Sequence, residues 1–175
     1  MANLDRPHGF RPIRHRYGAH PWVEQFSKVV GYGTAIFIND LVHRVADGSI
    51  EPWASATPGT TAISGVALNH GAASTATTHD VITDPGIICE AQDNSDTDGF
   101  AAADLGLNCN AEAGAGNATT KLSGHEIDES TINTTNSLDV HLERLYPVAD
   151  NEHGAWSRIE VSINKHRYAT QIAGV

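Results

Sequence analysis

The chain has 175 residues, 40% of them hydrophobic, and a formal net charge of −10. This length suits one domain of about 150 residues with an appendage, and a domain of that size can bury a real hydrophobic core. No apolar run approaches the ~20 residues of a membrane-spanning helix, and the acidic balance argues against nucleic acid as the main partner.

The first 22 residues differ from the rest of the chain in charge. They contain four arginines against one acid, Asp5, whereas the remaining residues include 20 acidic and 7 basic side chains. Three prolines disfavour an amphipathic helix here, and the large apolar residues between them are unusual for a solvated tail. We therefore expect residues 1–24 to form an extended basic docking arm, and residues 25–175 to form a β-rich core domain that folds without it.

Two kinds of side chain in this arm are candidates for contact with a partner. Aromatic groups can act as anchors, and arginine can pair with a carboxylate through two hydrogen bonds. The candidate interface residues are Arg6, Pro7, Phe10, Arg11, Pro12, Arg14, Arg16, Tyr17 and Trp22. Two alternatives remain open: the arm packs on its own core, a role that would suit Trp22, or it is a flexible tail.

Short strands are predicted through the first part of the core. Residues 26–30, 35–38 and 41–45 are short runs rich in β-branched or aromatic residues and bounded by glycine or turn signals. Residues 52–61 contain two prolines and several small polar residues and are predicted to form a loop.

Two glycines in the next segment, Gly65 and Gly86, indicate specific features of the backbone. Residues 62–68 form a predicted strand in which Gly65 marks a bulge or a close approach of two backbones. Asp84-Pro85-Gly86 lies between two short apolar runs and is a strong turn signal. We expect a hairpin or a tight corner there.

Residues 92–137 carry weaker signals. Residues 92–120 are rich in Asp, Asn, Gly, Ala and Thr and are expected to form a long, partly irregular excursion. A single helical turn is possible over residues 123–129, with Ser123 as the cap and Glu126 three residues later. Residues 130–137 are polar and predict a linker or loop.

The clearest strand signals come late in the chain. Apolar and polar residues alternate in residues 138–143 and again in residues 158–163, which is typical of strands with one buried and one wet face. Residues 150–154 between them predict a hairpin loop. The fold class is therefore all-β, a small antiparallel barrel or sandwich with long loops and an extended N-terminal arm.

The sequence predicts no cofactor, no metal site and no catalytic site. The acidic Asp93–Asp98 loop and the glycine that follows match the first half of a calcium loop, but Leu105 stands where the last carboxylate ligand should be. The ten histidines lack zinc-binding spacing, and Ser64 and Ser123 lack the leading glycine of a nucleophile elbow. The two cysteines, Cys89 and Cys109, are expected to be free and structural.

Several motifs, taken in their order along the chain, resemble those of head decoration (capsid-stabilising, or cement) proteins of tailed bacteriophages. The resemblance covers most of the chain. Its motifs are the opening MANLDRPHGFRP, Ile63–Ala67, Ala103–Asn108, Lys121–Asp128, Asp150–Glu152 and Val161–Tyr168.

The resemblance implies a structural virion protein and not an enzyme. It implies β-rich subunits, often trimers, on the outside of an icosahedral capsid, with an N-terminal arm lying across the capsid lattice. The implied partners are the major capsid protein and neighbouring copies of the chain, and the protein would be made in the host bacterial cytoplasm. The alternatives are a different virion component, such as a tail or fibre module, and a small metal-dependent β-barrel enzyme.

Overall fold

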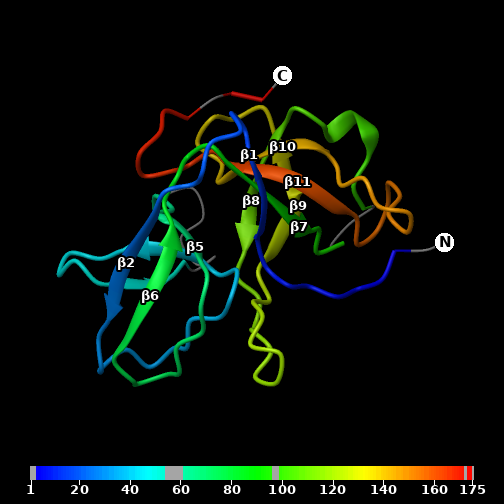
Figure 1. Ribbon diagram of the computed structural model, residues 1–175. Coiled ribbons are helices and arrows are strands. Elements are labelled where there is room, and N and C mark those ends of the chain that lie inside the picture. Colours follow the sequence, from blue (N-terminus) through cyan, green and yellow to red (C-terminus); the bar gives the residue numbers. More distant parts are fainter. Residues whose placement is uncertain (1–2, 54–60, 96–98, 172, 175) are drawn as a thin grey trace.

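Two antiparallel sheets form the body of the protein in a computed structural model, which describes residues 3–53, 61–95, 99–171 and 173–174 (Figure 1). In spatial order, the six-stranded sheet consists of β1 (Arg11–His15), β7 (Ile87–Gln92), β11 (Arg158–Ile163), β10 (Val140–Leu145), β8 (Asn108–Glu112) and β9 (Glu126–Asn133). The five-stranded sheet consists of β2 (Val23–Lys28), β6 (Thr77–Ile82), β5 (Gly65–Ala67), β3 (Leu41–Arg44) and β4 (Ile50–Pro52). A short 3₁₀ turn, η1 (Ala102–Asp104), precedes β8.

This architecture confirms the all-β prediction. Within the described residues neither sheet closes on itself, so the arrangement is sandwich-like and not a closed barrel. The late alternating segments pair as expected: β10 and β11 are antiparallel neighbours, with Leu142 opposite Val161.

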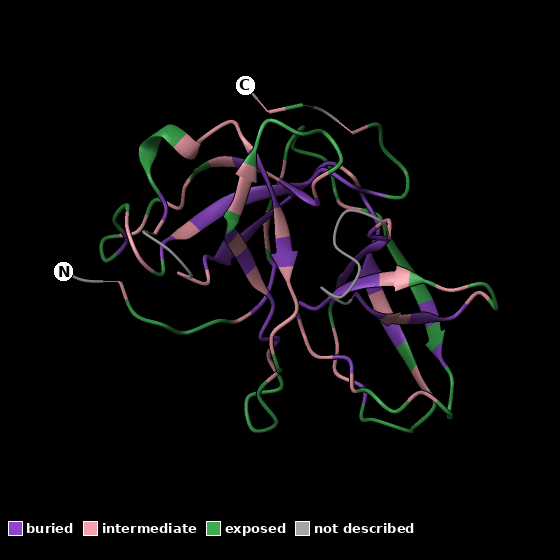
Figure 2. Cartoon of the chain, turned by 180° about the vertical axis from the view of Figure 1, so that it is seen from behind, coloured by how far each residue is buried: buried purple, intermediate pink, exposed green. Residues whose placement is uncertain are grey.

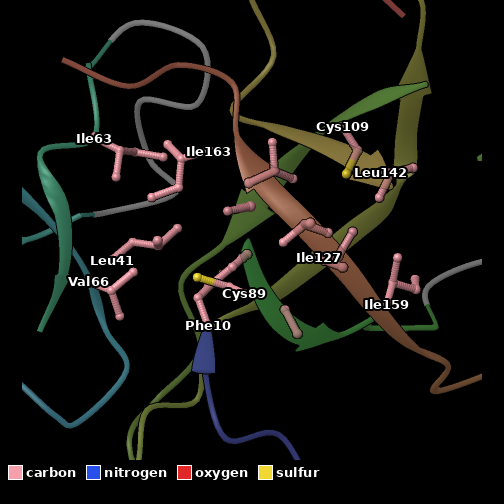
Figure 3. Packing of buried hydrophobic residues seen from close by; sticks show 14 of the residues in the cluster. Phe10, Leu41, Ile63, Val66, Cys89, Cys109, Ile127, Leu142, Ile159 and Ile163 are labelled. Carbon is pink, nitrogen blue, oxygen red and sulfur yellow. The ribbon is translucent and has the colours of Figure 1, made fainter. Parts of the chain in front are cut away.

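The main core lies where the two sheets meet. The six-stranded sheet contributes the alternate residues of its strands that face inward, including Cys89, Leu142 and Ile159, while Leu41 and Val66 come from the five-stranded sheet (Figure 3). All five are fully buried. The alternation expected from the sequence therefore places one face of each central strand in this core.

The central strands of the five-stranded sheet, β5 and β3, are apolar on both faces. Leu41 and Val66 pack in the main core, whereas their chain neighbours Val42 and Ala67 pack in a second cluster on the other face, together with Phe26 and Ile36. A strand buried on both faces reads as a continuous apolar run. This explains why these short strands show little alternation in the sequence.

Three local predictions were wrong. Residues 35–38 do not form a named strand: Ile36 makes an isolated bridge with Gly71 and covers the second cluster. Most of the segment expected to form a helical turn, residues 123–129, belongs instead to strand β9. The same strand continues through residues 130–133, which are the first half of the predicted polar linker. The Ser123 hydroxyl instead accepts a hydrogen bond from the backbone N–H of His125.

The Asp84-Pro85-Gly86 turn is a corner between sheets and not a hairpin. It links β6 of one sheet to β7 of the other. The Asp84 carboxylate accepts a hydrogen bond from the backbone N–H of Gly86 at 2.8 Å, which fixes the turn.

Gly65 marks a close approach of two backbones, as predicted. A Cβ atom at this position would lie 2.0 Å from the carbonyl oxygen of Ile82 on the neighbouring strand. Only glycine therefore allows β5 to pair with β6 at this distance.

Candidate functional site

The N-terminal segment of residues 3–16 runs along one edge of the six-stranded sheet, where its strand β1 pairs with β7 (Figure 1). The Asn3 side chain donates hydrogen bonds to the carbonyl oxygens of Glu152 and Ala155, both at 2.9 Å. Further along, the Gln92 side chain accepts a hydrogen bond from the Arg6 backbone N–H and donates one to the Leu4 carbonyl oxygen. The segment is thus tied down before its first strand begins.

Phe10 and β1 complete this attachment. Phe10 is fully buried in the main core, and its backbone N–H donates to the Asn39 carbonyl oxygen at 3.0 Å. β1 then pairs with β7, with Arg11 opposite Glu90 and a bulge between Pro12 and Arg14. Proline is tolerated here because β1 is an edge strand. The structure therefore shows local packing for this part of the arm, which was one of the alternatives left open.

The arginines of this segment pair with acids that other strands supply. Arg14 donates to the carboxylate of Glu160 through Nε at 2.9 Å and through Nη2 at 2.7 Å, and Arg144 donates to the other carboxylate oxygen at 2.7 Å. Arg16 pairs with Glu143. Burial alone would raise the pKa of Glu160, but the two arginines outweigh it and lower that pKa.

Glu90 is the most deeply buried acid on this face. Its carboxylate contacts Arg11 at 2.5 Å, the His8 imidazole at 3.2 Å and Arg158 at 3.5 Å, and its side chain is fully buried. Burial favours the neutral acid, but the three basic neighbours outweigh it and lower the pKa of Glu90. The ring of Tyr146 receives the guanidinium groups of both Arg11 and Arg158, at 5.8 and 5.6 Å from its centroid.

These pairs leave the basic groups at the surface and the acids beneath them. The arginine side chains retain between 34% and 53% of their exposure, whereas the paired glutamates retain at most 17%. We call this surface the arginine face; it consists of Arg11, Arg14, Arg16, Arg144 and Arg158 over Glu90, Glu143 and Glu160. It is net positive in a protein whose overall charge is −10.

A pocket of about 580 Å³ opens at one end of the arginine face. The N-terminal segment forms one wall, and β7, β11 and the loop before β11 form the others. The lining residues are Asn3, Leu4, Arg6, His8, Arg11, Glu90, Gln92, Asp150, Asn151, Trp156 and Arg158. The pocket therefore combines three guanidinium groups with two exposed apolar side chains, Leu4 and Trp156.

The connection between β1 and β2, residues 17–22, is the second notable surface. Tyr17 is 80% exposed and Trp22 is 62% exposed. Val23, at the start of β2, is also exposed, and Figure 2 shows that β2 is among the most exposed strands. We call residues 17–22 the exposed connection.

Both ends of the exposed connection are held by the corner between the sheets. The Arg16 backbone N–H donates to the Gly86 carbonyl oxygen at 2.8 Å, and the Thr83 N–H donates to the Trp22 carbonyl oxygen at 3.0 Å. The Trp22 N–H in turn donates to the Asp84 carboxylate at 3.2 Å. The backbone is fixed at both ends while the aromatic rings project into solvent. Binding a partner through these rings therefore requires little further ordering of the chain.

The structure places the candidate interface residues in different surroundings. Phe10 is in the core, and Arg11, Arg14 and Arg16 are in ion pairs with the same chain. Arg6 lines the pocket, Pro7 is exposed beside it, and Pro12 lies in β1. Tyr17 and Trp22 are free of the core and remain available for a partner.

Sequence reasoning missed the acids and arginines that the other strands contribute to this face. Arg158 and Glu160 did have a signal, because the alternation in residues 158–163 places both on the wet face of their strand. Glu90 had none, since it lies in an apolar run that reads as fully buried.

A buried histidine and acid lie elsewhere, beside a second pocket of about 520 Å³. His125 Nε2 is 3.6 Å from the Asp40 carboxylate, and its Nδ1 accepts the Leu41 backbone N–H at 3.2 Å. Burial lowers the pKa of His125, against the effect of Asp40. Because the ring nitrogens face these two groups, the imidazole is placed to brace β3 and not to activate the nearby Ser123.

The described part of the chain has no cluster of metal ligands and no membrane-spanning helix. No group of three potential metal ligands comes together there, and no helix there is long and apolar enough to span a membrane. Residues 96–98 of the candidate calcium loop lie outside the described residues.

The chain matches no protein-family model, no curated protein and no solved structure. Inference about function therefore rests on the arginine face, the pocket and the exposed connection, together with the resemblance of the sequence motifs.

Proposed function

We propose that this protein is a non-catalytic structural protein that binds the outside of a bacteriophage capsid and stabilises the lattice of the major capsid protein. The observation that carries the proposal is the exposed connection, in which Tyr17 and Trp22 project from a backbone fixed at both ends. The resemblance of the sequence motifs to head decoration proteins supplies the identity of the partner.

Exposed aromatic groups on a fixed backbone have the properties of interface anchors. Tyrosine and tryptophan supply a large contact area and lose few rotamers on binding. Exposed Val23 continues this apolar surface onto the edge strand β2. The docking element is thus narrower than the arm expected from the sequence: it is centred on residues 17–22, whereas residues 3–16 belong to the fold.

Binding to a lattice explains how a modest contact could stabilise a shell. A protein that binds only the assembled state shifts the equilibrium toward assembly by mass action. Copies docked at neighbouring lattice positions, as a trimer on the outer capsid surface, repeat the same contact many times.

Co-sedimentation tests this function directly. Empty capsids assembled from the major capsid protein encoded in the same genome are mixed with purified protein and pelleted. We expect saturable binding of the wild type and at least about tenfold weaker binding of Trp22→Ala, because a central aromatic anchor contributes about 2 kcal/mol or more.

Leu68→Ala is the matched control, since Leu68 is also an exposed apolar residue but lies outside the exposed connection. It should bind as the wild type does. Failure of the wild-type protein to pellet with capsids would overturn the proposed function. Unchanged binding of Trp22→Ala would overturn the role of the exposed connection.

A further inference from the structure

The pocket beside the arginine face has a composition that points to a specific kind of ligand. Arg6, Arg11 and Arg158 line it, and the carboxylates that also line it are the fully buried Glu90 and the exposed Asp150. We infer that this pocket binds a short acidic peptide segment of a protein partner. The site is separate from the exposed connection, so the inference does not depend on capsid binding.

The guanidinium groups have donors to spare. Each arginine carries five N–H donors, and Glu90 has only two carboxylate oxygens to share among Arg11, Arg158 and His8. Among the described residues, neither oxygen of Glu90 accepts a hydrogen bond with good geometry. Its role is therefore that of a buried counter-charge, and the N–H groups that these contacts do not use remain for an incoming carboxylate.

The two arginines are also held in place before any ligand arrives. Arg11 and Arg158 both contact Glu90 and the face of the Tyr146 ring, and Arg11 Nη2 donates to the Tyr146 hydroxyl at 3.4 Å. Ordering a long side chain usually costs free energy when a ligand binds. Here that cost is met during folding, so the site is preorganised for an anion.

Size and apolar lining favour a peptide over an inorganic anion. A volume of about 580 Å³ is within the range of sites that enclose organic ligands. Leu4 is mostly exposed and Trp156 is partly exposed in the same pocket. A segment with carboxylates on either side of an apolar residue would use both features, whereas phosphate would use only the charges.

The charges that line the pocket predict opposite effects on ligand affinity for two kinds of substitution. Asp150 opposes an anionic ligand, while Arg6 and Arg158 attract one. Neutralising the acid and neutralising an arginine should therefore change the affinity in opposite directions, which general loss of structure would not do.

Isothermal titration calorimetry on the full chain, at low salt, tests the site with defined probes. The acidic probe is the acetylated and amidated peptide DELDE, and its uncharged counterpart is NQLNQ. We expect DELDE to bind, to weaken as salt is added, and NQLNQ not to bind. Arg158→Gln and Arg6→Gln should each weaken DELDE binding by about tenfold, as expected for loss of a charge-assisted hydrogen bond.

Two further variants make the test decisive. Asp150→Asn should tighten DELDE binding, and Arg167→Gln should leave it unchanged, because Arg167 is exposed and lies outside the pocket. Arg6 is also exposed, so Arg6→Gln provides a variant whose fold is preserved even if Arg158→Gln is unstable.

Three results would overturn the inference: no binding of DELDE, equal binding of NQLNQ, or a loss with Arg167→Gln as large as that with Arg6→Gln. Tripolyphosphate serves as a competing probe. If it binds more tightly than DELDE and shows the same dependence on Arg6 and Arg158, the pocket is a phosphate site and the peptide assignment is wrong.

Discussion

Buried acids under exposed arginines are the main residue-scale feature of this protein. Glu90 and Glu160 lie on the outer face of the six-stranded sheet, yet both are almost fully buried. Removing one partner of such a pair leaves an uncompensated buried charge, which costs several kcal/mol. The sequence predicted a wet face for Glu160, but not its burial, because the covering Arg14 comes from a strand 146 residues away.

A buried histidine gives the stability of the protein a defined response to acid. His166 is 3% exposed, and burial lowers its pKa to about 4 against the effect of Asp84. Its folded form stays neutral while the unfolded chain takes up a proton near pH 6.5. The unfolded state therefore binds more protons between pH 6.5 and 4, and the free energy of unfolding falls as the pH falls through this window.

We expect His166→Gln to remove about 2 kcal/mol of the stability difference between pH 7 and pH 5, as the size of the shift implies. Urea unfolding of wild type and variant at the two pH values measures this difference. His20→Gln is the matched control, because it makes the same substitution at an exposed histidine. An identical pH dependence in wild type and His166→Gln would contradict the assignment.

At the scale of elements, the largest departure from the sequence prediction concerns the N-terminal arm. Its basic and aromatic character was evident, but its place as the edge strand of a sheet was not. Pro12 and the lack of alternation hide β1, whose pairing depends on β7, more than seventy residues away. Such long-range pairing leaves little trace in local sequence.

Removal of residues 1–16 tests this role of β1. We expect the truncated chain to lose more stability than Phe10→Ala, which alone should cost about 3–5 kcal/mol as a buried Phe-to-Ala change, because Glu90 and Glu160 also lose basic partners. Chemical denaturation of the three proteins gives the comparison. The packing thus predicts that the core loses much of its stability without the arm, contrary to the expectation from the sequence that it folds alone.

Pro7→Ala is the control for this experiment, since Pro7 is exposed and outside any strand. Its effect should stay within about 0.5 kcal/mol, as is usual at the surface. Full stability of residues 17–175 on their own would show that β1 is a dispensable addition to the sheet.

At the scale of the whole molecule, the two sheets share one core. Trp53, Leu41 and Val66 on the side of the five-stranded sheet pack in the same cluster as Cys89 and Cys109 from the other sheet. The sequence predicted the all-β class through alternation and turn signals. It could not predict the strand order, because β1–β7 and β2–β6 join segments that no local signal links.

A shared core predicts a single cooperative transition, and the two thiols report on it. Both cysteines are buried and free, and burial raises the pKa of Cys89 to about 12 and that of Cys109 well above its ordinary value. Neither should react with a thiol reagent in the folded protein at pH 8. Labelling across a urea series should follow the same midpoint as far-UV circular dichroism, and labelling of either thiol before that midpoint would reveal independent unfolding of the six-stranded sheet.

The way the exposed connection is attached has a mechanical consequence. The corner of residues 83–86 holds both of its ends, and that same corner joins β6 of one sheet to β7 of the other. A force applied at Trp22 therefore passes into the junction of the two sheets as well as into the adjoining edge strand β2, instead of into that strand alone. A protein attached at this point would leave its support only after the hydrogen bonds that tie Trp22 to the corner had also broken.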